Sequence, residues 1–187
     1  PRPRHRARTR DRLRHRQAAA RRGRTALGTG PRHGVRVHVP EGGAADLDGD
    51  GDIDLTSADT TGHRVFWFEN DGTPGDGPWD VHAVTAASMP HAYDVDVTDI
   101  DADGDLDVFA SAYVGNELAW FENPGDPLVE EWVKHQIDVG EETRTVRAAD
   151  FDGDGDSDLL GGMVGEGLYW YENSGPPALQ WPRHTIK

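Results

Sequence analysis

The sequence predicts an all-β fold made of β-propeller blades, and three observations lead to this prediction. A nine-residue acidic loop occurs three times, beginning at Asp46, Asp99 and Asp150. Around each copy lie short stretches of aromatic and β-branched residues between Gly, Pro and Asp clusters, which are typical of strands. No part of this region has a sustained helical period. Four short strands in about 50 residues match one propeller blade, so we expect three four-stranded repeats that form a partial propeller.

The first strand of each repeat is expected just before the acidic loop. It is an apolar or alternating stretch at 93–97 and 145–149, whereas its counterpart at 42–45 is only Gly-Gly-Ala-Ala. The second strand follows the loop, and a glycine five residues before a tryptophan then marks a turn. These second strands are expected at 53–58, 106–112 and 159–164, and the turn glycines are Gly62, Gly115 and Gly165.

The third strand carries a tryptophan followed by Phe or Tyr, Glu and Asn. It is expected at 66–70, 119–123 and 169–173. A loop rich in Pro and Gly leads to the fourth strand, which is expected at 79–82, 132–135 and 181–184. The repeat domain therefore covers residues 41–187, with repeats at about 42–88, 89–139 and 140–187.

The acidic loop has the spacing of a calcium site. Its first copy, residues 46–54, has Asp at positions one, three, five, seven and nine and Gly at position six. Alternate residues of a tight loop point toward one centre, and the glycine permits the sharp turn. Position seven also offers its backbone carbonyl, and the ninth carboxylate closes the shell. Hard oxygen ligands in this number suit Ca²⁺, and five like charges repel unless a cation neutralises them.

We therefore expect about three Ca²⁺ ions per chain rather than three solvated acidic loops. The candidate metal ligands are Asp46, Asp48, Asp50, Asp52, Asp54, Asp99, Asp101, Asp103, Asp105, Asp107, Asp150, Asp152, Asp154, Asp156 and Asp158. An EF-hand is the obvious alternative, but it needs a Glu at position twelve and a helix on each side. Position twelve is Ser57, Ala110 or Gly161, and strand-like residues follow each loop, so we reject the EF-hand.

With these motifs in place, residues 42–187 resemble the FG-GAP/VCBS-type repeat family, the calcium-loop propeller repeats also found in integrin α subunits. The resemblance rests on the thrice-repeated Asp loop followed by a strand and then Trp-(Phe/Tyr)-Glu-Asn. The Phe-Gly and Gly-Ala-Pro elements that name the family are absent, so integrin ligand recognition is not carried over. The resemblance implies one Ca²⁺ in each blade, between its first two strands, in a protein that is secreted or displayed on a cell surface.

Residues 1–40 do not have the composition of a folded domain. They hold 13 Arg and one acid, with no Lys and no aromatic residue, which gives a balance of +12 against −27 for residues 41–187. So little apolar surface does not offset the entropy of ordering the segment. Three interpretations stay open: a disordered basic tail, an artefact of translating GC-rich DNA, and a basic arm for an anionic partner. We build no function on this segment and do not expect nucleic acid as a partner.

Composition excludes several classes of site. The chain has no cysteine, so disulfides and thiolate metal sites are not available. No apolar run approaches the ~18 residues of a membrane span, and no hydrophobic core of a signal peptide is visible.

The other recurring side chains are interpreted mainly as structural. Side chains that recur once per blade are more often packing between blades than sugar-stacking platforms, and the repeated histidines are expected to be hydrogen-bonded rather than metal ligands. The asparagines precede turns and are expected to bond their own backbone. These residues are Trp67, Trp120, Trp170, Trp79, Trp132, Trp181, His82, His135, His184, Glu69, Glu122, Glu172, Asn70, Asn123 and Asn173.

No nucleophile elbow, phosphate loop or acid pair stands outside the repeat pattern, so we expect no catalytic residues and no enzyme activity from this chain. The leading hypothesis is a calcium-stabilised propeller module for extracellular binding or adhesion, with a protein or a glycan as its ligand. The alternative is a non-catalytic or partial segment of a propeller-containing polysaccharide lyase or dehydratase.

Three blades are fewer than the four to eight of closed propellers. Because Lys187 falls at the end of the third repeat, we expect either the remaining blades of a longer propeller or self-association, most simply a six-bladed dimer. Open outer faces with aromatic rows would drive either outcome.

Overall fold

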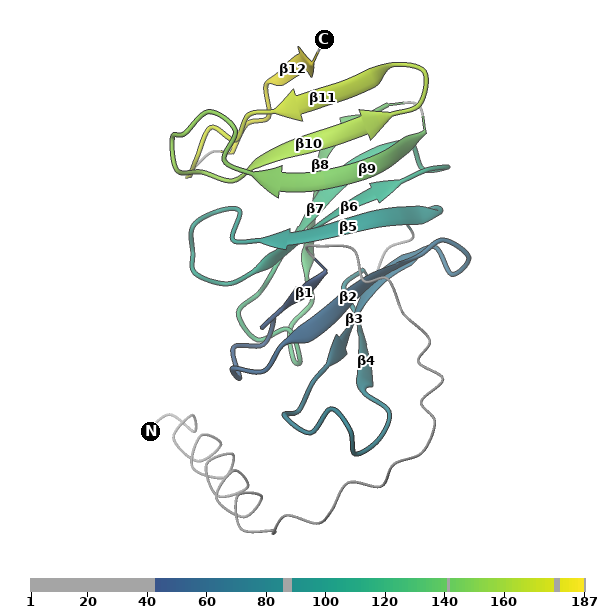
Figure 1. Ribbon diagram of the computed structural model, residues 1–187, viewed down its shortest axis with the longest axis vertical. Coiled ribbons are helices and arrows are strands. Elements are labelled where there is room, and N and C mark those ends of the chain that lie inside the picture. Colours follow the sequence, from purple (N-terminus) through teal and green to yellow (C-terminus); the bar gives the residue numbers. More distant parts are fainter. Residues whose placement is uncertain (1–42, 86–88, 141, 177–178, 187) are drawn as a thin grey trace, which may run out of the picture. The chain divides into compact units, whose positions relative to one another are not determined.

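The computed structural model describes residues 43–85, 89–140, 142–176 and 179–186. Within these residues the fold is all-β, with no helix and with three four-stranded antiparallel sheets (Figure 1). The sheets are not closed into a ring, which confirms the prediction of a partial propeller. The expectations for residues 1–40 lie outside the described residues. In the part of the chain that is described, no helix has the length and apolar character needed to cross a membrane.

Each sheet is a simple meander in which every strand pairs with the next one along the chain. We refer to the sheets as blades 1, 2 and 3. Blade 1 contains β1 (Ala44–Ala45), β2 (Asp54–Asp59), β3 (Arg64–Glu69) and β4 (Asp80–Ala83). Blade 2 contains β5 (Ala92–Thr98), β6 (Asp107–Ala112), β7 (Glu117–Glu122) and β8 (Val133–Val139). Blade 3 contains β9 (Thr143–Ala149), β10 (Asp158–Met163), β11 (Gly167–Tyr171) and β12 (Arg183–Ile186).

The register of the strands is the same in all three blades. Trp67 of β3 lies opposite Thr56, Trp120 of β7 opposite Phe109, and Trp170 of β11 opposite Leu160. The weak first strand of blade 1 is two residues long, since Gly43 and two alanines offer little side chain to pack. A common register means that equivalent residues of different blades can be compared directly.

Blade 2 lies between the other two blades and is covered on both faces. Every residue of β6 is buried, and so are the four central residues of β7. A strand covered on both faces is expected to be apolar throughout rather than alternating, and β6 and β7 carry Val108, Phe109 and Leu118 in this way.

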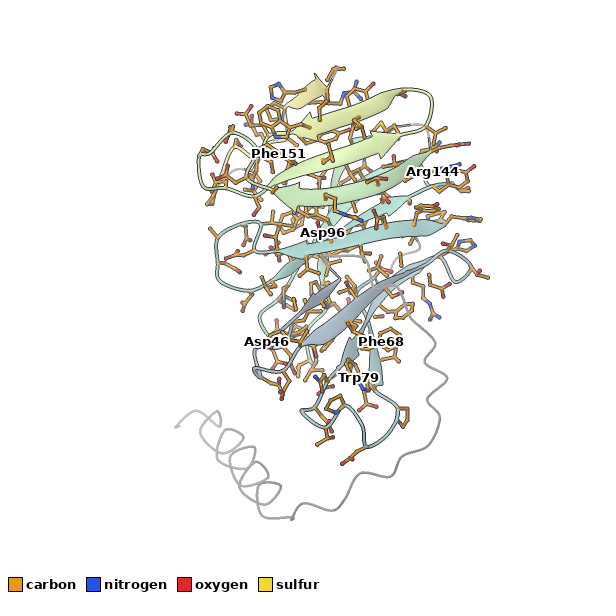
Figure 2. All side chains as sticks on the ribbon, viewed as in Figure 1. Asp46, Phe68, Trp79, Asp96, Arg144 and Phe151 are labelled. Carbon is orange, nitrogen blue, oxygen red and sulfur yellow. The ribbon has the colours of Figure 1, made fainter. Side chains whose placement is uncertain are left out.

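Two hydrophobic cores hold the blades together. The core between blades 1 and 2 includes Leu47, Val65 and Trp67 from blade 1, and the core between blades 2 and 3 includes Ile100, Leu118 and Trp120 from blade 2. The tryptophans are 0% and 3% exposed in these cores. The prediction that Trp67 and Trp120 pack between blades is confirmed. Figure 2 shows that side chains fill the space between successive sheets.

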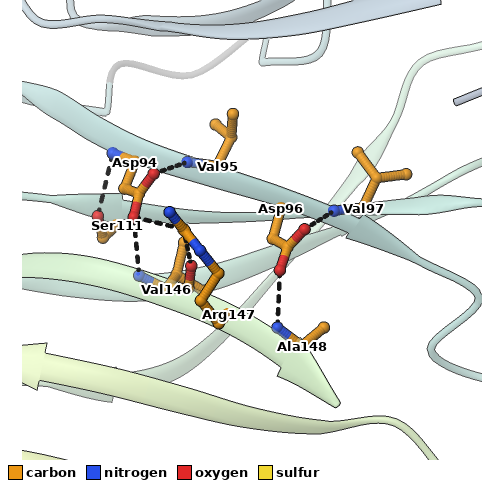
Figure 3. Close-up of polar contacts among 8 residues, drawn as sticks. All are labelled: Asp94, Val95, Asp96, Val97, Ser111, Val146, Arg147 and Ala148. Carbon is orange, nitrogen blue, oxygen red and sulfur yellow. Dashed lines mark hydrogen bonds and ion pairs between the residues drawn. The ribbon is translucent and has the colours of Figure 1, made fainter. Parts of the chain in front are cut away.

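Two aspartates of β5 add a polar link between blades 2 and 3 (Figure 3). Asp94 Oδ2 accepts hydrogen bonds from the backbone N–H of Val146, at 3.2 Å, and from the guanidinium of Arg147, at 2.7 Å. Asp96 Oδ2 accepts from the backbone N–H of Ala148 at 2.8 Å. The carboxylates thus bind the edge of β9 that has no strand partner in its sheet.

Candidate metal centres

The three acidic loops occupy equivalent places in the fold. Each connects the first and second strands of its blade, β1–β2, β5–β6 and β9–β10. All three lie on the same side of the stacked sheets (Figure 1). A strand flanks each loop on both sides, which agrees with the rejection of the EF-hand.

A repeated set of hydrogen bonds curls each loop around its own centre. In the first loop, Asp46 Oδ2 accepts from Gly51 N at 2.8 Å and Asp48 Oδ1 accepts from Asp50 N at 3.1 Å. Asp50 Oδ1 accepts from Asp52 N at 2.9 Å. The same three contacts recur in the loops of blades 2 and 3. The loop geometry is therefore a property of the motif rather than of one blade.

Position six has a left-handed backbone in every loop. Its φ is +95° at Gly51, +99° at Gly104 and +101° at Gly155. Residues with a Cβ rarely adopt this backbone conformation, which explains why the motif has glycine at this position. Position four is also left-handed, and there blade 2 has Ala102 at φ +61° where the other loops have glycine.

The ninth aspartate locks each loop to its blade. Asp54 Oδ2 accepts from Leu47 N at 2.9 Å, and its Oδ1 accepts from Asn70 N at 2.8 Å. Asp107 and Asp158 make the equivalent pairs of bonds. The side chains of all three are almost fully buried. These residues therefore stabilise the loop even apart from any role as a metal ligand.

Each loop brings three carboxylates close enough to hold one metal ion. Within each group the oxygens lie within 4.8 Å of one another. The groups are Asp46, Asp48 and Asp50; Asp99, Asp101 and Asp107; and Asp150, Asp152 and Asp158. These distances are compatible with a calcium site in every blade.

Three oxygens of these groups test the fit to a cation. Asp46 Oδ1, Asp48 Oδ2 and Asp99 Oδ1 are buried and have no hydrogen-bond partner among the described residues. A buried acceptor without a partner is costly. A metal ion at the centre of the loop would supply the missing partner. The residues present therefore fit a bound cation.

The remaining predicted ligands do not belong to these three carboxylate clusters. Asp54, Asp103 and Asp154 lie outside the 4.8 Å clusters, as do the seventh-position residues Asp52, Asp105 and Asp156. A Cβ at Gly72 would lie 2.7 Å from Asp52 Oδ2, and a Cβ at Gly125 or Gly175 would lie 3.0 Å or less from the Oδ2 of Asp105 or Asp156. The seventh side chain thus lies against the turn after the third strand, which leaves its backbone carbonyl as the group that could face the ion.

The electrostatics of the clusters also favour a cation. Burial, reinforced by the neighbouring carboxylates Asp50 and Asp54, raises the pKa of Asp48 to about 6. Burial likewise raises the pKa of Asp107 to about 7, with Asp101 and Asp103 adding to the effect. A raised pKa means that the negative charge on these carboxylates is unfavourable in the partly dehydrated site. A bound cation would replace the proton and neutralise that charge.

The asparagine after each third strand has a role that the sequence did not reveal. Its Oδ1 accepts from the backbone N–H two residues on, as predicted, at Gly72, Gly125 and Gly175. In blades 2 and 3, however, its Nδ2 also reaches the preceding blade. Asn123 Nδ2 donates to Leu47 O and Asn173 Nδ2 donates to Ile100 O, both at 3.0 Å. The recurrence of Asn at this position was visible in the sequence, but its partner belongs to another blade.

Each blade also carries a Trp–His pair in ring contact, stacked in blades 2 and 3 and tilted in blade 1, whose imidazole contacts a glutamate. His135 lies over Trp120 with ring centroids 4.3 Å apart, and its Nε2 is 2.7 Å from Glu122 Oε2. His82 and His184 make the same contacts in blades 1 and 3. The prediction that these histidines are hydrogen-bonded is confirmed. The glutamates also lie near the loops, since Glu69 contributes to the raised pKa of Asp48.

The sheets and loops together define a class of protein, namely repeat proteins made of propeller blades with an acidic loop between the first two strands of each. The model of the FG-GAP-like repeat matches residues 46–110 and 99–161, which together span more than half of the chain. The chain therefore belongs to the FG-GAP-like repeat family. No curated protein matches it.

Proposed function

We propose that the chain is a calcium-stabilised propeller module that binds one Ca²⁺ in each of its three acidic loops. The observation that carries this proposal is the convergence of three carboxylates within 4.8 Å in every loop. Hard oxygen ligands select Ca²⁺ over softer metals. The ion would neutralise the converging charges and satisfy the partnerless oxygens of Asp46, Asp48 and Asp99.

Calorimetric titration of the chelator-treated chain tests this function. We expect three Ca²⁺ ions to bind, and a higher melting temperature when they are present, because the ions bind the folded form preferentially. Mg²⁺ at the same concentration serves as the control, since it demands a smaller octahedral site and gives up its waters reluctantly. A stoichiometry of zero or one, or melting that chelation leaves unchanged, would contradict the proposal.

We further propose that the module serves in extracellular binding or adhesion, with a protein or a glycan as its ligand. One feature favours a glycan. A cavity of about 510 Å³ is lined by Trp120, Trp181, His135, Glu122 and the predicted calcium ligand Asp101. The partly exposed ring of Trp181, beside polar groups and a bound calcium ion, would suit a hydroxyl-rich ligand.

Glycan binding would be measured on an array of oligosaccharides with calcium and with chelator. We expect binding that requires calcium and that Trp181→Ala reduces. Tyr93→Ala is the matched control, because Tyr93 is 51% exposed and does not line the cavity. Binding to no glycan, together with capture of a protein ligand, would assign the module to protein recognition instead.

Binding rather than turnover is proposed because each acid and histidine near the loops recurs once per blade in the same setting. Secretion or display on the cell surface is proposed from two features. One is the family resemblance, and the other is the set of acidic loops, which suit calcium binding at the concentrations found outside cells. Calcium-dependent cleavage of a polysaccharide by the purified chain would contradict the first proposal. Retention of the tagged full-length protein inside its cells would contradict the second.

A further inference from the structure

The two interfaces inside the chain share one design. We call the side of a blade toward the following blade its back face, and the opposite side its front face. In each interface the back face of one blade covers the front face of the next. The back face of blade 1 presents Thr56, Val65 and Trp67, and that of blade 2 presents the equivalent Phe109, Leu118 and Trp120. The exposed fraction of these six residues is 5% or less.

The same face of blade 3 is open. Leu168, which is equivalent to Val65 and Leu118, is 45% exposed. Phe151, at the loop position of Leu47 and Ile100, is 46% exposed, whereas those two residues are 3% and 2% exposed. Leu160 and Trp170 are partly exposed as well. The back face of blade 3 is therefore an interface face without its partner among the described residues.

Blade 1 has the complementary open face. Its front face carries Leu55, Phe66 and Phe68, all partly exposed, and the two phenylalanine rings meet edge to face with centroids 5.2 Å apart. The equivalent residues of blade 2 are fully buried against blade 1. These residues are Val108, Ala119 and Phe121, each 0% exposed.

A polar contact completes the match. Asn123 and Asn173 use Nδ2 to bond both their own loop and the loop of the preceding blade. Asn70 Nδ2 bonds only its own loop, at Ile53 O, among the described residues. On blade 3, the Phe151 carbonyl stands where Leu47 and Ile100 accept the bridging amide. No described residue donates to that carbonyl.

From this complementarity we propose that the back face of blade 3 binds the front face of blade 1 of a second copy of this chain. The amide of Asn70 donates to the carbonyl of Phe151 in this contact, and Phe66 and Phe68 cover Leu168 and Trp170. Two chains joined twice in this way give six blades, a number within the range of closed propellers.

The contact is more polar than the two inside the chain. Ser57 and Asp59 occupy the front-face positions that Ala110 and Ala112 occupy in blade 2. The association is therefore expected to be reversible and concentration-dependent rather than permanent.

Sedimentation velocity of the full chain in calcium buffer tests the proposal with two variants, Phe66→Glu on the front face and Leu168→Glu on the back face. We expect the unmodified chain to be a dimer that dissociates on dilution and each variant alone to be a monomer. Mixing the two variants leaves one intact interface per pair, so the mixture is expected to dimerise again, more weakly than the unmodified chain. Val129→Glu is the control, because Val129 is 67% exposed and belongs to neither core, and it should dimerise normally.

Circular dichroism and calcium titration on each variant confirm that a monomer is still folded. A monomeric unmodified chain at tens of micromolar would overturn the proposal and leave the open faces to other blades or to a different partner. Dimers that only one of the two variants disrupts would overturn it as well, because they would indicate a like-with-like interface.

Discussion

In the loops of blades 2 and 3 the carboxylate of the ninth aspartate has two roles. Asp107 accepts backbone hydrogen bonds from Ile100 and Asn123 at 2.9 and 2.8 Å, and it also belongs to the cluster with Asp99 and Asp101. The backbone bonds orient the carboxylate before any ion arrives. Its burial at 1% exposure raises its pKa to about 7, so the carboxylate competes for a proton unless a cation is present.

Calcium binding is therefore predicted to be linked to proton release. The metal-free folded chain holds a proton on Asp107 more tightly than the unfolded chain, so its stability falls as pH rises from 3.8 to about 7. Calcium binds the deprotonated carboxylate, so calcium affinity should fall as pH is lowered through the same window. Calorimetry at neutral pH in two buffers of different ionisation enthalpy measures the released protons. Identical heats in both buffers, with an affinity that does not change with pH, would contradict this linkage.

At the scale of the strands, the link between blades 2 and 3 depends on two carboxylates. Asp94 contacts Val146 and Arg147, and Asp96 contacts Ala148 (Figure 3). The side chain of Asp94 is 14% exposed in its ion pair. Backbone N–H groups of β9 that lose these acceptors would face the interface unpaired.

Asp94→Ala is accordingly predicted to destabilise the calcium-loaded chain by about 1–3 kcal/mol, the cost of leaving partly buried donors without an acceptor. Chemical denaturation gives the free energy of unfolding of the variant and of the unmodified chain. Glu130→Ala is the control, since Glu130 is exposed in the loop between β7 and β8 and should change stability by less than ~0.5 kcal/mol. An equal, small effect of both substitutions would show that Asp94 does not hold the blades together.

The strands and loops could be predicted from the sequence because each depends on local spacing. Alternate aspartates around a glycine specify a curled loop wherever they occur. The contacts between blades could not be predicted in this way. The role of Asn123 as a bridge to Leu47, and of Asp94 as an acceptor for Val146, depends on residues 76 and 52 positions away. Trp170 likewise lies in the same Trp-(Phe/Tyr)-Glu-Asn motif as Trp120, yet only Trp120 is buried by a further described blade.

At the scale of the whole molecule, the three loops form a connected series. The carbonyl of Leu47 in the first loop accepts from the side chain of Asn123, whose backbone N–H donates to Asp107 of the second loop. Asn173 connects Ile100 of the second loop with Asp158 of the third loop in the same way. Each loop is thus joined by hydrogen bonds, through one asparagine, to the ninth aspartate of the next loop.

This series leads to a prediction for the third-position variants Asp48→Ala, Asp101→Ala and Asp152→Ala. Each should lose the calcium of its own loop and keep the other two. Coupling between binding sites is reciprocal, so Asp101→Ala should weaken calcium binding in both outer loops, and Asp48→Ala and Asp152→Ala should each weaken it in the second loop. The expected loss is about 2- to 10-fold, since one supporting hydrogen bond contributes about 0.5–1.5 kcal/mol. Asp48→Ala should change the third loop much less, and Asp152→Ala the first, because the series joins these two loops only through the second.

Titration against a competing chelator gives the individual affinities, and thermal melting shows whether each variant is folded. Equal weakening of both remaining sites in Asp48→Ala and in Asp152→Ala would show that the coupling passes through general stability rather than through the series of loops. Loss of all three ions from Asp101→Ala would show that blade 2, covered on both faces, holds the other two in place. In that case the blades would unfold as one unit, and the hydrogen-bonded series through Asn123 and Asn173 would be a consequence of their packing rather than a route between the sites.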